Sequence, residues 1–364
     1  MSNHLAAVAV AQGQPLQVQS RSTPKPGAGE LLLAVKSIAL NPADTLMRNA
    51  GVFIQNYPTV IGFDVAGVVL EVGEGVPTKS TDNEHGVFFQ SGITKVAAYS
   101  GAVWQGCDPD YGIFQERCLV PWQHAAPLPD SFPSWHLAAT LPVSVQVPLC
   151  AWDALGLSSS KSGIAAGEKE ALLIWGASSS VGTMGVQLAQ LQKTEGSAIR
   201  AVYATAGATN HAYVKSLGAD RVFDYKSPDV VDAIVSAAEE DGLVIRHCFL
   251  GTGDIVFCQA VLSAFSGGAE GKSGKIASAP IVPPEIKAVE GIEVIFLVPS
   301  PERTVRLAQF QKWMAQLSKY VAAGAIKPSP EPRLVGAGLD TINTGLDTLS
   351  QGVSCSKLVV QIEE

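Results

Sequence analysis

A turn rich in glycine and serine separates an apolar run, Leu172–Trp175, from an amphipathic segment. The turn begins at Gly176. Apolar residues at helical spacing then follow it: Val181, Met184, Leu188 and Leu191. Unpaired N–H groups and the helix dipole at the start of such a helix favour an anion. The segment therefore predicts a strand, a turn and a helix that hold the pyrophosphate of a dinucleotide, whose chemistry is hydride transfer.

The glycines and serines of the turn have separate expected tasks. Gly176 permits the tight turn, and Gly182 and Gly185 let the helix and the strand pack closely. Serine hydroxyls can donate to the phosphates and cap the helix. The predicted phosphate site is Gly176, Ser178, Ser179, Ser180, Val181 and Gly182. Because Ser179 stands where G-x-G-x-x-G has its middle glycine, an ordinary strand–turn–helix of small residues is the alternative interpretation.

The end of the second expected strand indicates which nicotinamide dinucleotide binds. A carboxylate there would bind the adenosine ribose hydroxyls of NAD, but residues 202–210 contain no acid. A 2′-phosphate would thus meet no repulsion, which favours NADPH. The available partners of this 2′-phosphate are Thr205, Asn210, Lys215 and Tyr225. For Lys215, a solvated charge on a helix is an equally good interpretation.

Two parts of the chain, with different sequence patterns, are expected to position this turn. From residue 172 onward, apolar runs alternate with helical patterns, which predicts a parallel sheet with crossover helices. The expected strands are Leu172–Trp175, Ile199–Ala204, Arg221–Phe223, Arg246–Phe249, Lys275–Ala277 and Val294–Phe296. The first ~130 residues instead indicate strands and turns, at Leu31–Ala39, Val60–Val72 and Gly112–Val120. A helix over Glu302–Ala323 and a strand over Lys357–Ile362 complete the pattern.

Composition excludes several classes of protein. The chain has 364 residues, 47% of them hydrophobic and 16% charged, which predicts a folded protein of two domains. The net charge is −8 without a basic cluster, so a nucleic-acid surface is not expected. Six cysteines without a CxxC pair indicate reduced thiols in the cytoplasm. No stretch offers the ~20 predominantly apolar residues of a membrane span.

Several motifs, in this order along the chain, resemble the medium-chain dehydrogenase/reductase superfamily. They are Leu40–Asp44 (LNPAD), Tyr57–Gly67 (YPTVIGFDVAG), the Gly176–Gly182 turn, Lys215–Asp220 (KSLGAD), Phe223–Tyr225 (FDY) and Lys357–Val360 (KLVV). The resemblance is strongest to the zinc-independent quinone oxidoreductases and the fungal trans-acting enoyl reductases. It implies an α/β protein with a GroES-like, β-rich catalytic domain and a doubly wound Rossmann sheet. The expected division is 1–145 and 301–364 for the catalytic domain, with 146–300 binding NADPH.

The resemblance also allows a test for zinc. Zinc alcohol dehydrogenases have a Cys at the position of Asn41 and a His at the position of Phe63, and a third thiolate is expected near 145–149. Catalytic zinc needs three protein ligands, and Asp64 alone cannot hold it. We therefore expect a metal-free protein. Without a Lewis acid, a conjugated acceptor is easier to reduce than a simple ketone.

Candidate catalytic residues follow from the same motifs. Asn41 can hydrogen-bond the nicotinamide ribose or a substrate carbonyl, and Asp44 can orient the ribose hydroxyls; helix capping is the alternative for both. Phe53 occupies a position where some enoyl reductases have a tyrosine proton donor, so water is an expected proton source. Tyr57 is the nearby candidate, or it packs before Pro58.

The resemblance places further residues at the cofactor. Leu250 and Leu297 are expected to line the nicotinamide side, while Val147 replaces a threonine that often contacts the cofactor. Lys357 resembles a terminal lysine near the cofactor, with a lysine on an edge strand as the alternative.

Three functional hypotheses remain open from the sequence. The first is NADPH-dependent reduction of an activated C=C bond or a quinone. The second is a trans-acting enoyl reductase whose substrate is tethered to the acyl carrier of a polyketide synthase, which would then be a partner. The third is an NADPH-binding protein without turnover. The sequence leaves the substrate, its stereochemistry and the oligomeric state undetermined.

Overall fold

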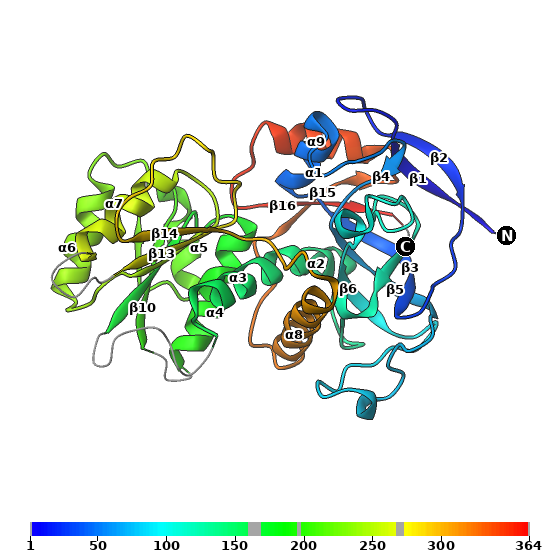
Figure 1. Cartoon of the computed structure of the whole chain (residues 1–364), viewed down its shortest axis with the longest axis horizontal. Coiled ribbons are helices and arrows are strands. Elements are labelled where there is room, and N and C mark those ends of the chain that lie inside the picture. The colour runs from blue at the N-terminus through cyan, green and yellow to red at the C-terminus, as the bar shows by residue number, and fades with distance from the viewer. Residues whose placement is uncertain (1, 159–168, 195–197, 267–272, 363–364) are drawn as a thin grey trace. The chain divides into compact units, whose positions relative to one another are not determined.

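The computed structural model describes residues 2–158, 169–194, 198–266 and 273–362 (Figure 1). The chain divides into two compact units. Unit 1 comprises residues 1–143 and 300–364, and unit 2 comprises residues 144–299. The boundaries expected from the sequence fell after residues 145 and 300.

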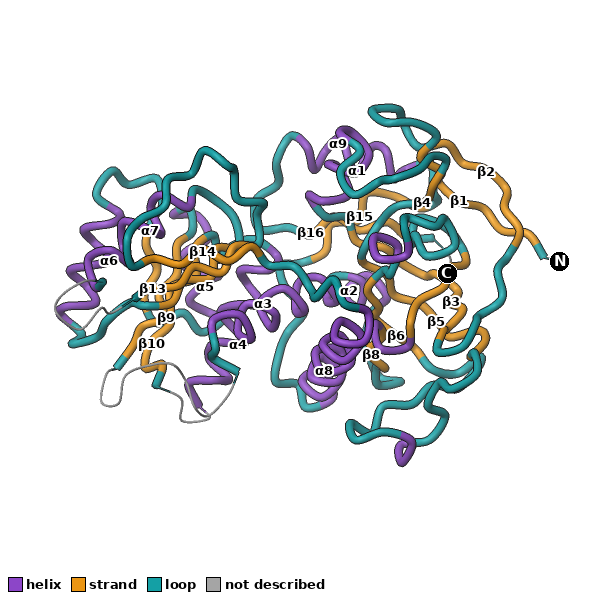
Figure 2. Tube along the Cα trace, viewed as in Figure 1, coloured by secondary structure: helices purple, strands orange, loops and turns teal. Residues whose placement is uncertain are grey.

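Unit 2 alternates strands with helices, which are distinguished by colour in Figure 2. Its strands are β9 (Glu170–Trp175), β10 (Ile199–Thr205), β11 (Arg221–Phe223), β12 (His247–Leu250), β13 (Gly274–Ser278) and β14 (Ile292–Phe296). Its helices are α3 (Leu141–Leu155), α4 (Ser180–Thr194), α5 (His211–Ser216), α6 (Val230–Glu240) and α7 (Ile255–Phe265). The strands form a parallel sheet in the order β11-β10-β9-β12-β13-β14. This is the strand order of a Rossmann fold.

The central strand β9 shows why the apolar runs form a buried sheet. Every residue of β9 is buried, because helices cover both faces of a parallel sheet. Leu173 belongs to an apolar core with residues of α6 and α7. Its neighbour Ile174 faces α4, where a Cβ added to Gly185 would lie 3.6 Å from Ile174 Cγ2. The predicted parallel sheet with crossover helices is confirmed.

Unit 1 is rich in β-structure. Its strands are β1 (Asn3–Ala9), β2 (Gln17–Ser22), β3 (Glu30–Ala39), β4 (Thr59–Val60), β5 (Asp64–Val72), β6 (Lys95–Tyr99), β7 (Arg117–Pro121), β8 (Ala125–Pro127), β15 (Pro332–Ala337) and β16 (Lys357–Gln361). Its helices are α1 (Pro42–Ala50), α2 (Trp135–Ala139), α8 (Arg303–Ala322) and α9 (Thr341–Ser350). The larger sheet has the order β15-β16-β3-β5-β6-β8, with β7 also paired to β3, and the smaller has the order β2-β1-β4.

Two expected strands of unit 1 differ from the structure. The single strand expected over Val60–Val72 is wrong, because β4 pairs with β1 and β5 pairs with β3 in a different sheet. The break lies at Gly62, whose φ of 105° favours glycine and where an added Cβ would lie 2.4 Å from the Phe114 ring. The strand expected from Gly112 begins only at Arg117.

The return of the chain to unit 1 brings distant residues together. In the larger sheet, Ala39 of β3 is paired with Val359 of β16 on one side and with Asp64 of β5 on the other. Continuing the antiparallel register by two residues places Lys357 opposite Asn41. The ends of three strands therefore converge where the LNPAD motif begins.

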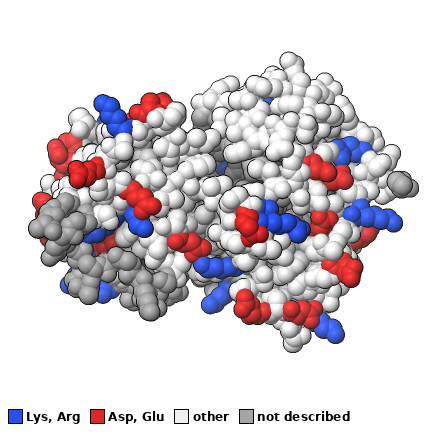
Figure 3. All heavy atoms as spheres, viewed as in Figure 1, with Lys and Arg blue, Asp and Glu red and all other residues white. Residues whose placement is uncertain are grey.

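The distribution of surface charge and the character of the helices agree with what the composition predicts. On the face shown in Figure 3, basic and acidic side chains alternate without a broad patch of one sign. Among the described residues, none of the helices combines the length and the apolar character needed to cross a membrane.

Candidate active site

The turn between β9 and α4 is built by close backbone approaches. Gly176 has a φ of 75°, and an added Cβ there would lie 2.5 Å from the carbonyl oxygen of Thr252. A Cβ on Gly182 would lie 2.3 Å from the carbonyl oxygen of Gly176, and one on Gly185 would lie 2.9 Å from the Phe249 ring. Only glycine fits these positions without movement, so the expected tight turn and close helix–strand packing are present.

Ser179 caps helix α4 with its side chain. Its hydroxyl accepts a hydrogen bond from the N–H of Gly182 (3.1 Å) and donates to the carbonyl of Gly176 (2.8 Å). The hydroxyl is thus used within the turn. Ser180 and Val181 belong to the first turn of α4, where N–H groups have no partner inside the helix. These backbone groups are the ones that can bind a phosphate.

We expect Gly182→Ala to weaken binding of the expected dinucleotide about 10-fold or more, because moving the turn misaligns several N–H donors, each worth about 1 kcal/mol. The added methyl group would also lie 2.8 Å from the Cα of Ala177, so the backbone must shift. The dissociation constant is measured by calorimetry, with circular dichroism as a check of folding. Gly242→Ala is a control in the same unit for a general loss of stability, since its φ of 64° strains an alanine although an added Cβ there meets nothing within 4 Å. Equal affinities of the two variants would contradict the expectation.

Of the residues predicted around the adenosine half, Thr205 ends β10, Lys215 lies in α5 and Tyr225 follows β11. Thr205 is fully buried, and its hydroxyl accepts the N–H of Gly176 at 3.0 Å, so its side chain supports the turn. Lys215 and Tyr225 are exposed, and Asn210 at the end of the 3₁₀ turn 208–210 is half-buried. Lys226 was not predicted from the sequence, yet its ammonium lies 5.8 Å from the centre of the Tyr225 ring.

The two leucines expected on the nicotinamide side differ in burial. Leu250 ends β12 and is only 2% exposed, because its side chain belongs to the apolar core of unit 2. The residue after it approaches the turn instead, since a Cβ on Gly251 would lie 3.1 Å from Ser179 Oγ. Leu297 follows β14, and its N–H donates to the carbonyl of Ser278 at 2.9 Å.

In unit 1, Asn41, Asp64 and Lys357 form a buried polar network. The Lys357 ammonium donates to Asn41 Oδ1 at 2.5 Å and lies 2.9 Å from Asp64 Oδ2. Asn41 Nδ2 donates to the same Asp64 oxygen at 2.9 Å. The other Asp64 oxygen accepts the N–H of Val143 at 2.7 Å. All three side chains are at most 4% exposed.

Asp44 joins this network through the backbone. It is the third residue of α1, and its Oδ2 accepts the N–H of Asn41 at 2.7 Å. This bond caps the helix, so helix capping, the alternative interpretation of Asp44, has a structural basis. The Asn41 side chain makes no such bond, although Asn41 is the N-cap residue. Burial, with the negative charge of Asp64 adding to it, raises the pKa of Asp44 from 3.8 to about 8.

Tyr57 lies outside this network. Its hydroxyl is buried beside Gly51, where an added Cβ would lie 3.1 Å away, and it has no hydrogen-bond partner among the described residues. Removal from water, and the nearby Cys107 thiol, raise the pKa of Tyr57.

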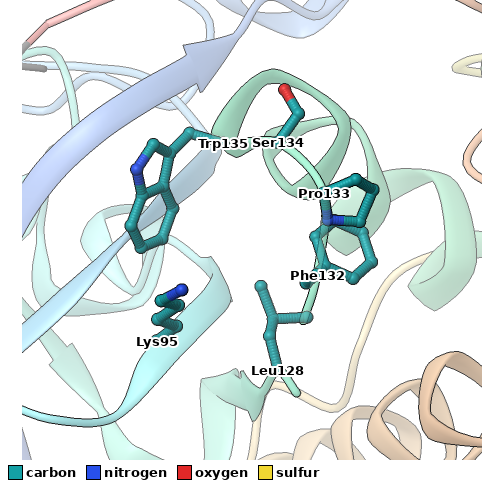
Figure 4. Close-up of a pocket in the computed structure, with 6 residues that line it drawn as sticks. All are labelled: Lys95, Leu128, Phe132, Pro133, Ser134 and Trp135. Atoms are coloured by element: carbon teal, nitrogen blue, oxygen red, sulfur yellow. The ribbon is translucent and has the colours of Figure 1, made fainter. Parts of the chain in front are cut away.

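A surface pocket of unit 1 is lined by other residues, namely Lys95, Leu128, Phe132, Pro133, Ser134 and Trp135 (Figure 4).

Comparison with known proteins identifies the family. Residues 27–130 match the alcohol dehydrogenase GroES-like domain. The trans-enoyl reductase tndF of Aspergillus flavipes is 37% identical over 365 residues, which cover 99% of this chain and 99% of that protein. This chain belongs to the medium-chain dehydrogenase/reductase superfamily, in the branch of the fungal enoyl reductases.

A second relative and a solved structure of the same fold agree with this. The trans-enoyl reductase tazE of Aspergillus terreus is 37% identical, over 84% of this chain and 95% of that protein. A crystal structure of an alcohol dehydrogenase superfamily protein from Novosphingobium aromaticivorans has a TM-score of 0.76 at 21% identity, over 99% and 100% of the two chains. As a member of this superfamily the protein is an oxidoreductase with a nicotinamide cofactor.

The residues at the zinc positions of the superfamily do not suit zinc. Asn41 offers an amide already bonded to an ammonium, and Phe63 offers a phenyl ring 5.6 Å from the Tyr99 ring centre. In the part of the chain that the structure describes, no three His, Cys, Asp or Glu side chains are grouped to hold a metal ion.

Sequence reasoning missed the role of Asp64. The sequence suggests Asp64 only as a zinc ligand, whereas in the structure its carboxylate contacts both Asn41 and Lys357. Its position in the Gly62–Asp64 stretch of the quoted motif was the available signal. Its partner Lys357 lies 293 residues further along the chain, so the ion pair was not visible locally.

Proposed function

We propose that this chain is a trans-acting enoyl reductase that uses NADPH to reduce the conjugated C=C bond of an acyl thioester on the carrier of a polyketide synthase. The observation that carries the proposal is the similarity, over 99% and 84% of the chain, to two relatives that bear the name trans-enoyl reductase. The glycine turn of unit 2 supports it, because this arrangement suits a dinucleotide pyrophosphate.

Bound NADPH supplies a hydride, which the β-carbon of the conjugated acyl group accepts. In this proposal the segment from Ser178 to Gly182, which ends the turn and begins α4, binds the pyrophosphate, and Leu297 lies along the nicotinamide side. Asn41 and Asp44 orient the nicotinamide ribose. A proton from Tyr57 or from water completes the reduction at the α-carbon.

We propose further that the reaction proceeds without a metal ion. An amide at position 41 and a phenyl ring at position 63 lack the Cys, His or carboxylate donors that catalytic zinc requires. Elemental analysis of the purified active protein should therefore show zinc far below one equivalent per chain. A full equivalent of zinc that a chelator removes together with the activity would contradict this.

The function is tested by following NADPH oxidation against a panel of acceptors. Crotonyl groups on the cognate acyl carrier and on pantetheine stand beside free enones and quinones, and NADH replaces NADPH in a parallel series. We expect the carrier-bound thioester to give the highest kcat/KM. Faster turnover of free enones or quinones would favour a stand-alone reductase, and NADPH binding without any turnover would favour the non-catalytic alternative.

Lys215→Glu should lower kcat/KM for NADPH about 10- to 100-fold, because a charged hydrogen bond of about 1.5–3 kcal/mol to the 2′-phosphate is lost. The value for NADH should change little, since NADH lacks that phosphate. Lys169→Glu is the matched control in unit 2, since Lys169 is likewise exposed and precedes β9, at the other end of that strand from Gly176. Equal losses with NADPH and NADH would contradict a contact between Lys215 and the 2′-phosphate.

A further inference from the structure

The hydrogen bonds of the Asn41 side chain leave one of its acceptor positions unused. A primary amide has two N–H donors and a carbonyl oxygen with two lone pairs. Asn41 Nδ2 donates to Asp64 Oδ2 at 2.9 Å and to the carbonyl of Ala39 at 3.3 Å. Both donors are thus used. Oδ1 accepts from the Lys357 ammonium at 2.5 Å, which uses one lone pair and leaves the other.

The two charged partners dictate this orientation of the amide. In the flipped orientation the NH₂ group would face the Lys357 ammonium, and the carbonyl oxygen would face the Asp64 carboxylate. Both contacts would be repulsive. Asp64 and Lys357 are almost completely buried, so the low dielectric strengthens this preference. The backbone of Asn41 is fixed as well, because its N–H donates to Asp44.

Lys357 itself is poorly placed to serve mainly as a ligand of the cofactor. It is only 3% exposed, and its ammonium is engaged by Asn41, the N-cap residue of α1, and by Asp64 at the start of β5. An edge-strand lysine open to solvent, which was the alternative from the sequence, does not describe it either. β16 lies between β15 and β3 in the sheet.

We propose that Lys357 and Asp64 are positioning residues, which lock the Asn41 amide so that its carbonyl oxygen accepts one further hydrogen bond. The group recognised there is a hydroxyl donor, the nicotinamide ribose of the cofactor, and not a substrate carbonyl. This inference rests on the proposed function for the identity of that cofactor. Lys357 then acts on binding through Asn41, and not by touching the cofactor.

The inference is tested by a double-mutant cycle on cofactor binding. The variants are Asn41→Ala, Lys357→Gln and the combination of both, and calorimetry measures their dissociation constants for NADPH. Adenosine 2′,5′-bisphosphate is the second probe, because it contains the adenosine half without the nicotinamide ribose. Lys357→Arg, which keeps the cation, is a further variant if Lys357→Gln fails to fold, and circular dichroism reports folding throughout.

We expect Asn41→Ala and Lys357→Gln each to weaken NADPH binding by a similar factor of about 5–10. The combination should be no weaker than Asn41→Ala alone, because Lys357 acts only through the amide. Binding of the bisphosphate should stay unchanged in all variants.

Two results would overturn the inference. One is a loss from Lys357→Gln, or from Lys357→Arg, that is as large in the Asn41→Ala background as in the wild type, since that would indicate direct contact with the cofactor. The other is weakened binding of the bisphosphate. If the cycle behaves as expected but no enoyl thioester is reduced, only the proposed function fails. If wild-type protein binds no NADPH, both fail.

Discussion

Lys357→Met should lower the free energy of unfolding by about 3–5 kcal/mol, because removing one partner of a buried ion pair leaves the other charge uncompensated. The carboxylate left behind is that of Asp64, which is fully buried and lies 2.9 Å from the Lys357 ammonium. Asn41 also loses the donor to its Oδ1. Urea unfolding followed by tryptophan fluorescence measures the change.

Two controls separate this effect from a generic loss of charge. Lys275→Met removes a lysine whose ammonium lies 3.5 Å from Glu293 and whose side chain is 37% exposed, so it should cost less than about 1 kcal/mol. The double variant Lys357→Met/Asp64→Leu removes both charges of the buried pair and should recover part of the loss. If Lys357→Met costs no more than Lys275→Met, the buried network does not contribute as described.

Asp44→Asn should remove a pH dependence of stability that is large in the wild type. The pKa of Asp44 rises on folding from 3.8 to about 8, so the folded protein holds a proton that the unfolded chain releases. The stability that this proton provides is fully present below about pH 4 and is lost as the pH rises towards 8. The change is about 1.4 kcal/mol per pH unit within that window.

The comparison of the wild type with Asp44→Asn isolates the effect of this one carboxyl group. Asp64 and Lys357, the charged groups that face Asp44, are the same in both proteins. We expect the wild type to lose stability relative to Asp44→Asn by a few kcal/mol between pH 5 and pH 8, as measured by urea unfolding at each pH. Parallel stability curves across that range would show that Asp44 titrates normally in the folded state.

The Rossmann unit could be predicted from the sequence because its signals are local. Buried parallel strands such as Leu172–Trp175 appear as short apolar runs, and the Gly176–Gly182 turn lies directly between one of them and its helix. Strand boundaries in unit 1 were harder. The run Val60–Val72 is mostly apolar, so its sequence does not show that the chain changes sheets at Gly62.

The candidate site could be predicted only in its local parts. Asn41 and Asp44 stand in one short motif, and the structure joins them by a hydrogen bond. The contact of both Asn41 and Asp64 with Lys357 depends on the register of β16 against β3 and of β3 against β5. Pairing between strands so far apart in the chain leaves no periodic signal.

The transfer of deuterium from labelled NADPH tests the central claim most directly. The protein is mixed with a crotonyl-loaded acyl carrier and NADPH that carries deuterium at C4 of the nicotinamide, and the acyl product is analysed by mass spectrometry. We predict a saturated butyryl group that contains one deuterium at its β-carbon. Recovery of unreduced crotonyl carrier would contradict the account. When both faces of the nicotinamide are labelled, a butyryl group without deuterium at its β-carbon would contradict it as well.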